Sequence, residues 1–293
     1  MKKLIINETE RVTRKKYNPF ERTYVLKTIN SKDYWKVKDY FKPINFNLVV
    51  ESILNNNTIG QVNVDKLENP NFSFIWTYTD SVLIGGKPSD EAKILPDVLS
   101  RELIPEFKKY GLPGLLVYVD MNSPWKEKIP EFFGKDRISV LKRKFYTIDP
   151  KTTSIDYEKS YRYKVIKIEN VIDNKHLINH RMLNGWIHSF WKDLDSFISG
   201  GTGYCALEGN TIVSWCLTVY ADKNKRELGL ETANGFRRRG YATAVARETV
   251  KECIKHGYKL HWHCREDNLA SIALAEKLGF EKISDYEIFY LKI

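Results

Sequence analysis

The stretch RELGLETANGFRRRGYATAVARETVKECIKHGYKLHWHC, residues 226–264, predicts the fold of the second half of the chain. Residues 227–233 have the composition of a strand, and three arginines then lead into Gly240. The small or apolar positions that follow recur at i, i+3, i+4, i+7, i+8 and i+11 of a helix. These positions are Ala242, Val245, Ala246, Thr249, Val250 and Cys253. With a terminating Gly257 and a second strand at residues 258–264, the stretch predicts a strand–loop–helix–strand unit.

The loop in this unit has the features of an anion-binding site. A helix N-terminus carries unpaired N–H groups and about half a positive charge. Gly240 allows a ligand to approach the backbone, Ala242 keeps the first turn slim, and the arginines at residues 237–239 add positive charge. The pattern predicts a phosphate or pyrophosphate site. A strand–helix turn that binds nothing remains the alternative.

Length and composition favour a folded protein of two domains. The chain has 293 residues, of which 42% are hydrophobic, so a packed core can form and dominant disorder is excluded. Lys and Arg number 47 against 37 Asp and Glu, a formal net charge of +10. That excess suits a polyanion, an acidic membrane or a phosphorylated cofactor, and does not choose among them.

Targeting and metal signals are weak. The first residues contain only a short apolar run, Leu4 to Ile6, and no segment approaches the ~18 apolar residues of a membrane helix. Four cysteines, at positions 205, 216, 253 and 264, form no C-x-x-C pair and fit no zinc module. We therefore expect a cytoplasmic protein with reduced, buried thiols, no metal and no membrane partner.

The order of elements predicts a mixed α/β sheet fold, of the α+β type, in two halves. Residues 72–79 and 81–85 are predicted strands, and residues 90–110 a helix that Pro96 and Pro105 kink or break. The second half repeats a similar order, with a hairpin that turns at Gly209-Asn210. The polar segment 149–156 is the expected linker, which gives domains at residues 1–150 and 155–293.

Two other motifs fail in their structural context. Residues 200–206 contain a G-x-G-x-x-A string, but a hairpin follows it where a dinucleotide-binding fingerprint needs a helix. His261 and His263 lie on one face of a predicted strand without further ligands nearby in sequence. We expect a packed or hydrogen-bonded histidine pair rather than a zinc site.

The R-x-x-G-x-A pattern at residues 237–242 resembles the acyl-CoA-binding motif of the GNAT N-acetyltransferase superfamily. Together with N-x-x-S-x-x-x-A-E-K-L-G-F at residues 268–280, it is similar to the GNAT family that includes zwittermicin A resistance proteins. The likeness covers residues 197–285, and residues 60–86 resemble the family's N-terminal portion. It implies two GNAT-like domains in tandem, of which only the C-terminal one carries the acetyl-CoA motif. The N-terminal domain would be degenerate and would support the fold or shape the acceptor cleft.

The resemblance implies how acetyl-CoA would bind. Its pyrophosphate would lie on the backbone N–H groups of residues 238–243, and its pantetheine arm would run between the strands at 227–233 and 259–264. The implied cofactor-binding residues are Leu230, Thr232, Ala233, Arg237, Arg238, Arg239, Gly240, Tyr241, Ala242, Thr243, Asn268 and Ser271.

Acetyl transfer needs a base for the amine and an acid for the thiolate. Glu231 lies at the cofactor end of the first strand and is a candidate base; the alternative is a structural carboxylate that holds an arginine. Many superfamily members have a tyrosine acid where this chain has Ala275. Ser271, Tyr286 and Tyr290 are therefore the acid candidates, each with a structural role as the alternative.

The leading hypothesis is an N-acetyltransferase that moves acetyl from acetyl-CoA to an amine of a small molecule, by direct attack on the thioester. A non-catalytic acyl-CoA-binding or regulatory protein is the second hypothesis, because the usual tyrosine is missing. A basic nucleic-acid-binding protein is the third, because of the net charge. On the leading hypothesis the partners are acetyl-CoA and the amine, without nucleic acid, and a homodimer is open.

Overall fold

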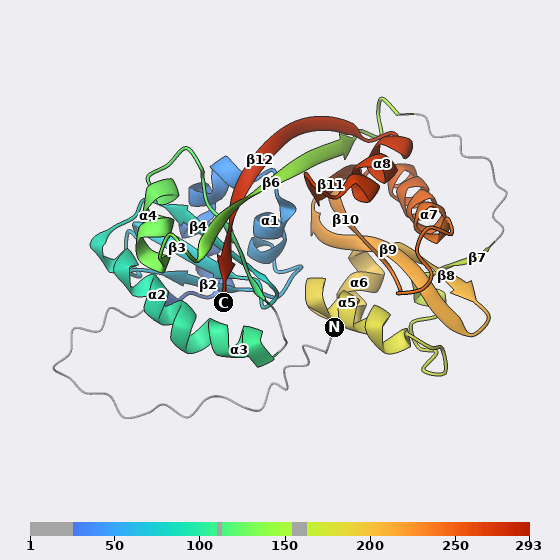
Figure 1. Ribbon diagram of the computed structural model, residues 1–293, viewed down its shortest axis with the longest axis horizontal. Helices are drawn as coiled ribbons and strands as arrows, with labels where there is room; N and C mark the ends of the chain where they lie inside the picture. The colour runs from blue at the N-terminus through green and yellow to red at the C-terminus, as the bar shows by residue number, and fades with distance from the viewer. Residues whose placement is uncertain (1–25, 110–112, 154–162) are drawn as a thin grey trace. The chain divides into compact units, whose positions relative to one another are not determined.

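The computed structural model describes residues 26–109, 113–153 and 163–293, shown as ribbon in Figure 1. The chain forms two compact units that interleave along the sequence. Unit 1 contains residues 1–44, 60–139 and 289–293, and unit 2 contains residues 45–59 and 140–288. The domains predicted from the sequence, residues 1–150 and 155–293, are single continuous segments, unlike these interleaved units. That division of the chain stays a prediction. Part of the predicted linker at 149–156 lies outside the described residues.

Unit 1 has a sheet in the order β1-β2-β3-β4-β5-β12, in which β4 and β5 are parallel. Its elements are β1 (Lys27–Thr28), η1 (Ser31–Lys36), η2 (Lys38–Ile44), β2 (Gln61–Val64), β3 (Phe72–Trp76), β4 (Ser81–Gly86), η3 (Asp90–Ile94), α2 (Leu95–Val98), η4 (Leu99–Leu103), α3 (Ile104–Lys109), β5 (Gly114–Tyr118) and α4 (Trp125–Phe133). Helices α2 and α4 and the sheet enclose one apolar core that includes Phe74, Leu95 and Trp125. The last residues of β12 complete this sheet beside β5.

Unit 2 has its strands in the order β12-β6-β11-β10-β9-β8-β7, in which β10 and β11 are parallel. Its elements are α1 (Leu48–Leu54), β6 (Ile138–Ile148), β7 (Lys164–Lys167), η5 (Ile168–Asn170), α5 (His180–Phe190), α6 (Leu194–Gly200), β8 (Gly203–Glu208), β9 (Thr211–Asp222), β10 (Lys225–Thr232), α7 (Tyr241–Lys255), β11 (Lys259–Arg265), α8 (Leu269–Lys277) and β12 (Glu281–Lys292). The predicted strand–loop–helix–strand unit is therefore β10–α7–β11.

The sheet of unit 2 is buried on both faces. Cys216 of β9 belongs to the core beneath α7 and α8, whereas its neighbours Trp215 and Leu217 belong to the core beneath α5 and α6. Side chains alternate between the faces of a strand, so β9 supplies both cores. Helix α1 packs on β9 and β10, although it lies more than 150 residues earlier in the chain.

The structure confirms the hairpin at Gly209-Asn210 and breaks the helix predicted at 90–110 into four short pieces, with Tyr110 outside the described residues. Residues 31–44 form the two short 3₁₀ helices η1 and η2, the second of which contains Pro43. Helix α1 was missed altogether. Five of its seven residues are buried, and a helix buried all round carries no polar face for a periodic pattern to reveal.

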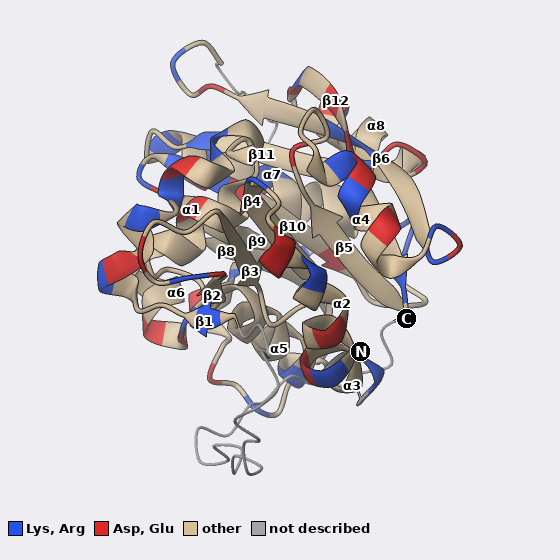
Figure 2. Cartoon of the chain, turned by 90° about the vertical axis from the view of Figure 1, so that its left-hand side faces the viewer, with Lys and Arg blue, Asp and Glu red and all other residues tan. Residues whose placement is uncertain are grey.

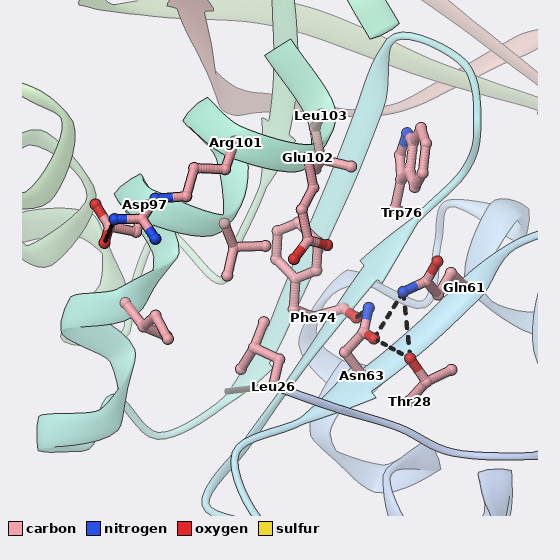
Figure 3. A pocket seen from close by; sticks show the side chains of 12 residues that line it. Leu26, Thr28, Gln61, Asn63, Phe74, Trp76, Asp97, Arg101, Glu102 and Leu103 are labelled. Atoms are coloured by element: carbon pink, nitrogen blue, oxygen red, sulfur yellow. Dashed lines mark hydrogen bonds and ion pairs between the residues drawn. The ribbon is translucent and has the colours of Figure 1, made fainter. Parts of the chain in front are cut away.

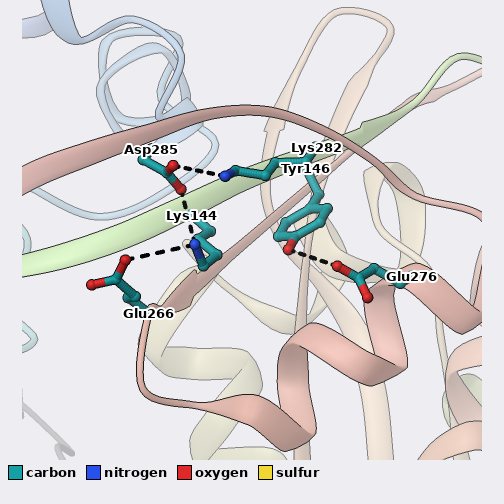
Figure 4. Close-up of polar contacts among 6 residues, drawn as sticks. All are labelled: Lys144, Tyr146, Glu266, Glu276, Lys282 and Asp285. Atoms are coloured by element: carbon teal, nitrogen blue, oxygen red, sulfur yellow. Dashed lines mark hydrogen bonds and ion pairs between the residues drawn. The ribbon is translucent and has the colours of Figure 1, made fainter.

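Polar contacts fix α8 to the strands beside it (Figure 4). Lys144 of β6 lies 3.1 Å from Asp285 of β12 and 3.7 Å from Glu266, just before α8. Tyr146 donates its hydroxyl to Glu276 of α8 at 3.2 Å. These contacts hold α8 against β6, and with it the Asn268 end that faces the site described below.

Lys and Arg, coloured blue in Figure 2, and Asp and Glu, coloured red, occur side by side along several helices and loops. On α4, for example, Lys128 pairs with Glu131 at 2.7 Å. In the part of the chain that the structure describes, no helix is long and apolar enough to cross a membrane. All four cysteines are free and buried, and burial raises the pKa of Cys205 and Cys216 to about 12.

Candidate active site

The parallel strands β10 and β11 separate partway along their length. Their pairing runs from Lys225 to Glu227 on β10 and stops where Glu227 meets His261. β10 pairs with β9 along its whole length, from Lys225 to Thr232, with a register shift between Glu227 and Leu228. β11 stays paired with β6 as far as Arg265. The facing edges of residues 228–232 and 262–265 are therefore left apart, and we call the opening between them the unit 2 wedge. Irregular pairing of this kind is common beside active sites.

A cavity of about 810 Å³ occupies the unit 2 wedge, and every residue that lines it belongs to unit 2. Most of the sequence-predicted site residues meet there: Leu230, Glu231, Thr232, Arg237, Arg238, Gly240, Tyr241, Ala242, Thr243, Asn268 and Ser271. Four predicted residues, Ala233, Arg239, Tyr286 and Tyr290, do not line the cavity. The structure thus brings the loop, the first turn of α7 and the start of α8 to one place, and the role of each residue there stays a prediction.

The first turn of α7 faces this cavity. Ala244 is the first residue of the helix whose N–H bonds back to the cap, at 3.1 Å from the Gly240 carbonyl. Among the described residues, the N–H groups of Tyr241, Ala242 and Thr243 have no backbone acceptor, and all three residues line the cavity. Three free N–H groups at a helix N-terminus form a ready site for an anion.

The backbone conformation at position 240 gives a second reason for a glycine there, which the sequence did not reveal. Gly240 caps α7 with a φ of 89°, in the left-handed region that residues with a Cβ adopt at a cost. Arg238 also has a left-handed backbone, with a φ of 60°. With Gly235 at a φ of 85°, the loop reaches the helix through three left-handed residues, and Arg238 is the one that is not a glycine.

The lining of the cavity is strongly positive. It includes the cations Arg143, Arg237, Arg238, Arg265 and Lys277, against Glu231 as its one acidic side chain. Arg237 lies 3.4 Å from Glu231, and Arg265 is bound to Asp267 at 2.6 Å. An excess of positive charge in a concave site attracts anionic ligands, so the cavity suits a polyphosphate.

Glu231 has the contacts of a structural carboxylate. Its Oε1 accepts the N–H of Thr232 at 3.1 Å and lies 3.4 Å from Nη2 of Arg237. This is the arrangement that the sequence left open as the alternative to a base. The base role of Glu231 remains a prediction. The ion pair with Arg237 would compete with proton uptake by this carboxylate.

Glu227 is a second acid beside the wedge, and no sequence pattern singled it out. It lies where the two strands part, and its side chain is 11% exposed. Burial raises the pKa of Glu227 to about 7, while Arg143 and the backbone N–H of Leu48 act in the opposite direction. A carboxyl group that titrates near neutral pH has the acidity that a general base requires.

His263 lines the cavity and lies next to Glu227. Its Nε2 is 3.9 Å from Oε2 of Glu227, and its Nδ1 is 3.0 Å from the hydroxyl of Tyr286. The neighbouring His261 has its Nδ1 3.2 Å from the carbonyl of Phe46, which confirms the expected hydrogen-bonded histidines. Within the described ranges, no three His, Cys, Asp or Glu side chains group as a metal site would need.

Comparison with known proteins identifies the family. The family model described as GNAT acetyltransferase matches residues 38–289. The chain belongs to the GNAT acetyltransferase family.

The relatives of this GNAT chain agree with that placement. It is 26% identical over 271 residues to an uncharacterized N-acetyltransferase of Bacillus subtilis, YdfB, covering 91% of this chain and 98% of the relative. Among solved structures, a GCN5-related N-acetyltransferase-like protein from Streptococcus suis matches 89% of this chain and 99% of its own at 21% identity, with a TM-score of 0.63. A tandem GNAT protein from the clavulanic acid biosynthesis pathway matches 91% of this chain and 97% of its own at 10% identity, with a TM-score of 0.53. The protein is thus an acetyltransferase by family, and the two structures share its fold.

The acid candidates of this GNAT chain differ in their placement. Ser271 lines the cavity, and its Oγ accepts the indole N–H of Trp262 at 3.0 Å. Asn268 caps α8 by accepting the Ser271 N–H at 3.1 Å. Tyr290 belongs to unit 1, where it pairs with Leu116, and it does not line the cavity. Ala275 is fully buried in the core, and an alanine side chain has no hydroxyl to donate.

Sequence reasoning could have found Glu227 and His263 only in part. The acid pattern RELGLE places two carboxylates on one strand, and HWHC places two histidines on the next. What the sequence could not show is the register that sets Glu227 opposite His261, or the return of residues 45–54 to cover them. Both depend on contacts between residues far apart in the chain.

Unit 1 has a smaller cavity of about 290 Å³ between its sheet and the segment 94–103 (Figure 3). Gln61 donates to Asn63 at 3.0 Å and to Thr28 at 3.3 Å, while Arg101 pairs with Asp97 at 3.2 Å. These polar side chains are satisfied by one another. The cavity therefore lacks the excess of positive charge and the free helix N–H groups of the unit 2 wedge.

Proposed function

We propose that this GNAT protein transfers acetyl from acetyl-CoA to an amine of a small molecule. The observation that carries the proposal is the unit 2 wedge, a cavity of about 810 Å³ between diverging parallel strands with the start of α7 at its mouth. Its volume, its positive lining and its unpaired N–H groups together suit a nucleotide thioester. We also propose that, within the GNAT family, this chain is related to the zwittermicin A resistance proteins.

Acetyl-CoA has a natural place in the wedge. The N–H groups of Tyr241, Ala242 and Thr243 would receive the pyrophosphate, with Arg237 and Arg238 beside it. The unpaired edge of β10 at residues 228–232 would bond the amide groups of the pantetheine arm as an added strand does. Asn268 and Ser271 border the same cavity from α8.

The chemistry follows from the groups at the point where the strands part. The amine nitrogen attacks the thioester carbonyl carbon, the new C–N bond forms, and the C–S bond breaks with its electron pair leaving on the CoA sulfur. The amine must give up one proton, and Glu227 is the base that we favour, acting directly or through one water. Glu231 is the second candidate, because it lines the cavity but is engaged with Arg237.

Unit 1 is proposed to be a degenerate GNAT-like half that supports the catalytic one. It contains a parallel strand pair, β4 and β5, but no R-x-x-G-x-A loop after β4. The fold shared with a tandem GNAT protein supports this interpretation. Acetyl-CoA should therefore bind with a stoichiometry of one per chain.

The test is a CoA-release assay against a diverse amine library, combined with calorimetric titration of acetyl-CoA. We expect one acetyl-CoA site and CoA release that depends on the amine, with mass spectrometry showing an acetylated product. Tight acetyl-CoA binding without amine-dependent release across the library would contradict acetyl transfer to a small amine. Absence of acetyl-CoA binding would overturn the assignment of the wedge itself.

A further inference from the structure

A buried base needs a route by which its proton leaves. Glu227 would gain a proton from the amine in every turnover and must lose it before the next. Two buried atoms beside it, Oε2 of Glu227 and Nε2 of His263, have no hydrogen-bond partner among the described residues and lie 3.9 Å apart. Closing this gap by about 1 Å, or placing one water in it, would bring the two groups within proton-transfer reach.

The second ring nitrogen of His263, Nδ1, lies on the side away from Glu227. It lies 3.0 Å from the hydroxyl of Tyr286, which is half-buried on β12. The ring is held in place by Phe145, stacked at 4.6 Å with an interplanar angle of 2°. Phe46 packs edge-on against Tyr286 at 4.8 Å. The buried carboxylate, the imidazole and the phenol thus form a chain from the site toward solvent.

We propose that His263 and Tyr286 return the proton of Glu227 to solvent between turnovers; this role rests on the proposed acetyl transfer. Glu227 gives its proton to Nε2 of His263, Nδ1 passes its own proton to the Tyr286 oxygen, and the phenol releases its original proton to water. His263 and Tyr286 each end with as many protons as they began with, Glu227 returns to its ionised form, and one proton leaves to water. The ring proton of His263 moves from Nδ1 to Nε2, so the ring must regain its starting tautomer before it relays again. His263 and Tyr286 act through Glu227 and are positioning residues.

The surrounding charges keep this relay in its working state. Burial, Arg143 of β6 and His261 of β11 lower the pKa of His263 well below its ordinary value, so the ring stays neutral. A neutral imidazole can accept a proton at one nitrogen while it releases one from the other. Arg143 also lies near Tyr286, with its guanidinium carbon 5.9 Å from the ring centre. The N–H of Leu48 faces Glu227 from α1. Burial and the positive charge of Arg143 thus oppose storage of the proton on His263.

The test uses Tyr286→Phe, which removes the hydroxyl and keeps the ring that packs on Phe46 and His263. With an amine found in the library, we expect kcat to fall at least 10-fold in dilute buffer while the Kd for acetyl-CoA is unchanged. Added imidazole buffer should restore most of the rate, because a small diffusible base replaces the missing step. Tyr204→Phe is the matched control, since Tyr204 lies on β8 and does not line the cavity.

His263→Gln provides a second variant if Tyr286→Phe folds poorly. A glutamine amide can bond to neighbours but does not relay a proton, so kcat should fall and respond to imidazole in the same way. A wild-type enzyme that turns over, with a Tyr286→Phe rate that is unchanged or insensitive to imidazole, overturns the relay alone. A wild type that binds acetyl-CoA but acetylates no amine overturns the proposed function, and the relay with it.

Discussion

The two units contain the same strand divergence but differ in what surrounds it. In unit 2 the parallel pairing of β10 and β11 stops at Glu227 opposite His261. In unit 1 the parallel pairing of β4 and β5 stops at Leu83 opposite Tyr118, and β4 continues to Gly86. A cavity of about 490 Å³, the unit 1 wedge, lies beyond this point. Strand divergence alone therefore does not make the site.

The difference lies in the walls. In the unit 1 wedge the indole of Trp125 donates to the Gly86 carbonyl at 2.9 Å, so the end of β4 is already bonded within the protein. Its charged lining is Lys87 against Asp39 and Asp120, which is net negative. The element that follows β4 is a five-residue 3₁₀ helix, whereas β10 leads into the fifteen-residue α7. Polyphosphate binding needs positive charge and a helix N-terminus as well as parted strands.

The buried acid beside the unit 2 wedge, Glu227, should give the largest change in activity. Glu227→Gln should lower kcat/KM about 10²- to 10⁴-fold, the usual range for loss of a general base. Wild-type activity should rise with pH through about 7, where Glu227 becomes ionised, and the variant should lack this limb. Steady-state pH–rate profiles check both points. Glu231→Gln is the control and should keep the rise in activity with pH. If Glu231→Gln instead loses this activity while Glu227→Gln keeps the wild-type pH–rate profile, the base is Glu231.

The same acid should make stability depend on pH. The pKa of Glu227 is raised by burial to about 7, so the folded protein binds a proton more tightly than the unfolded chain does. Its contribution to stability is present at low pH and is lost as pH rises from about 4.5 to 7, by on the order of 3 kcal/mol. The unfolding free energy of wild type relative to Glu227→Gln, measured in denaturant, should fall across that window. A flat difference would show that Glu227 titrates normally.

The loop distinguishes the wedges next. Gly240→Val should raise the Kd for acetyl-CoA about 100-fold, because its Cβ would meet the Tyr163 hydroxyl at 3.4 Å and shift the loop and the N–H groups that would bind the pyrophosphate. The substitution also strains the backbone, since Gly240 has a φ of 89°. Gly209→Val is the matched control, with a φ of 57° at the hairpin turn and no neighbour within 4 Å. Calorimetry should show unchanged affinity in the control; equal losses in both variants would mean that a general loss of stability, rather than a shift of this loop, is measured.

Each wedge has a tryptophan whose indole N–H donates a hydrogen bond beside it, Trp125 in unit 1 and Trp262 in unit 2. Trp125→Phe should leave the Gly86 carbonyl without its donor and lower the unfolding free energy by about 1–3 kcal/mol, with acetyl-CoA affinity unchanged. Trp262→Phe removes the donor to Ser271 in the wall of the unit 2 wedge and should weaken acetyl-CoA binding a few-fold. Denaturant unfolding and calorimetry on both variants separate the effects. A change in acetyl-CoA affinity in Trp125→Phe would place a nucleotide in unit 1.

The smallest effect concerns the second left-handed residue of the loop. Arg238→Gly should raise the unfolding free energy by about 1 kcal/mol, because glycine adopts a φ of 60° without strain. It should also weaken acetyl-CoA binding slightly, and more so at low salt, since one cation is lost. Lys223→Gly, at a φ of 44° in the β9–β10 turn, should gain similar stability without any change in affinity. Thermal unfolding and titration at two salt concentrations provide the readout.

The sequence predicted β10, α7, β11 and α8 well because their signals are local: helical spacing, terminal glycines and short apolar strands. It placed the loop and Asn268 near one another through the family motif. It missed α1, whose residues are apolar all round, and it missed the partners of Glu227 for a related reason. The carboxylate of Glu227 is raised in pKa by burial that α1 helps to create, and no pattern around residue 227 encodes a helix at residue 48. The sequence singled out His263 as one of two histidines on a strand, but it did not predict that Glu227 lies next to it.

The interleaving of the two units has a consequence for how the protein is made. Unit 2 uses residues 45–59, which leave the ribosome early, and unit 1 uses residues 289–293, which are synthesised late. The apolar face of α1 must therefore wait for β9 and β10, while β5 waits for the last residues of β12. Neither unit can finish folding during synthesis of its own half. Cutting the gene near codon 150 should consequently yield two insoluble fragments, and coexpression of both fragments is the way to recover either one.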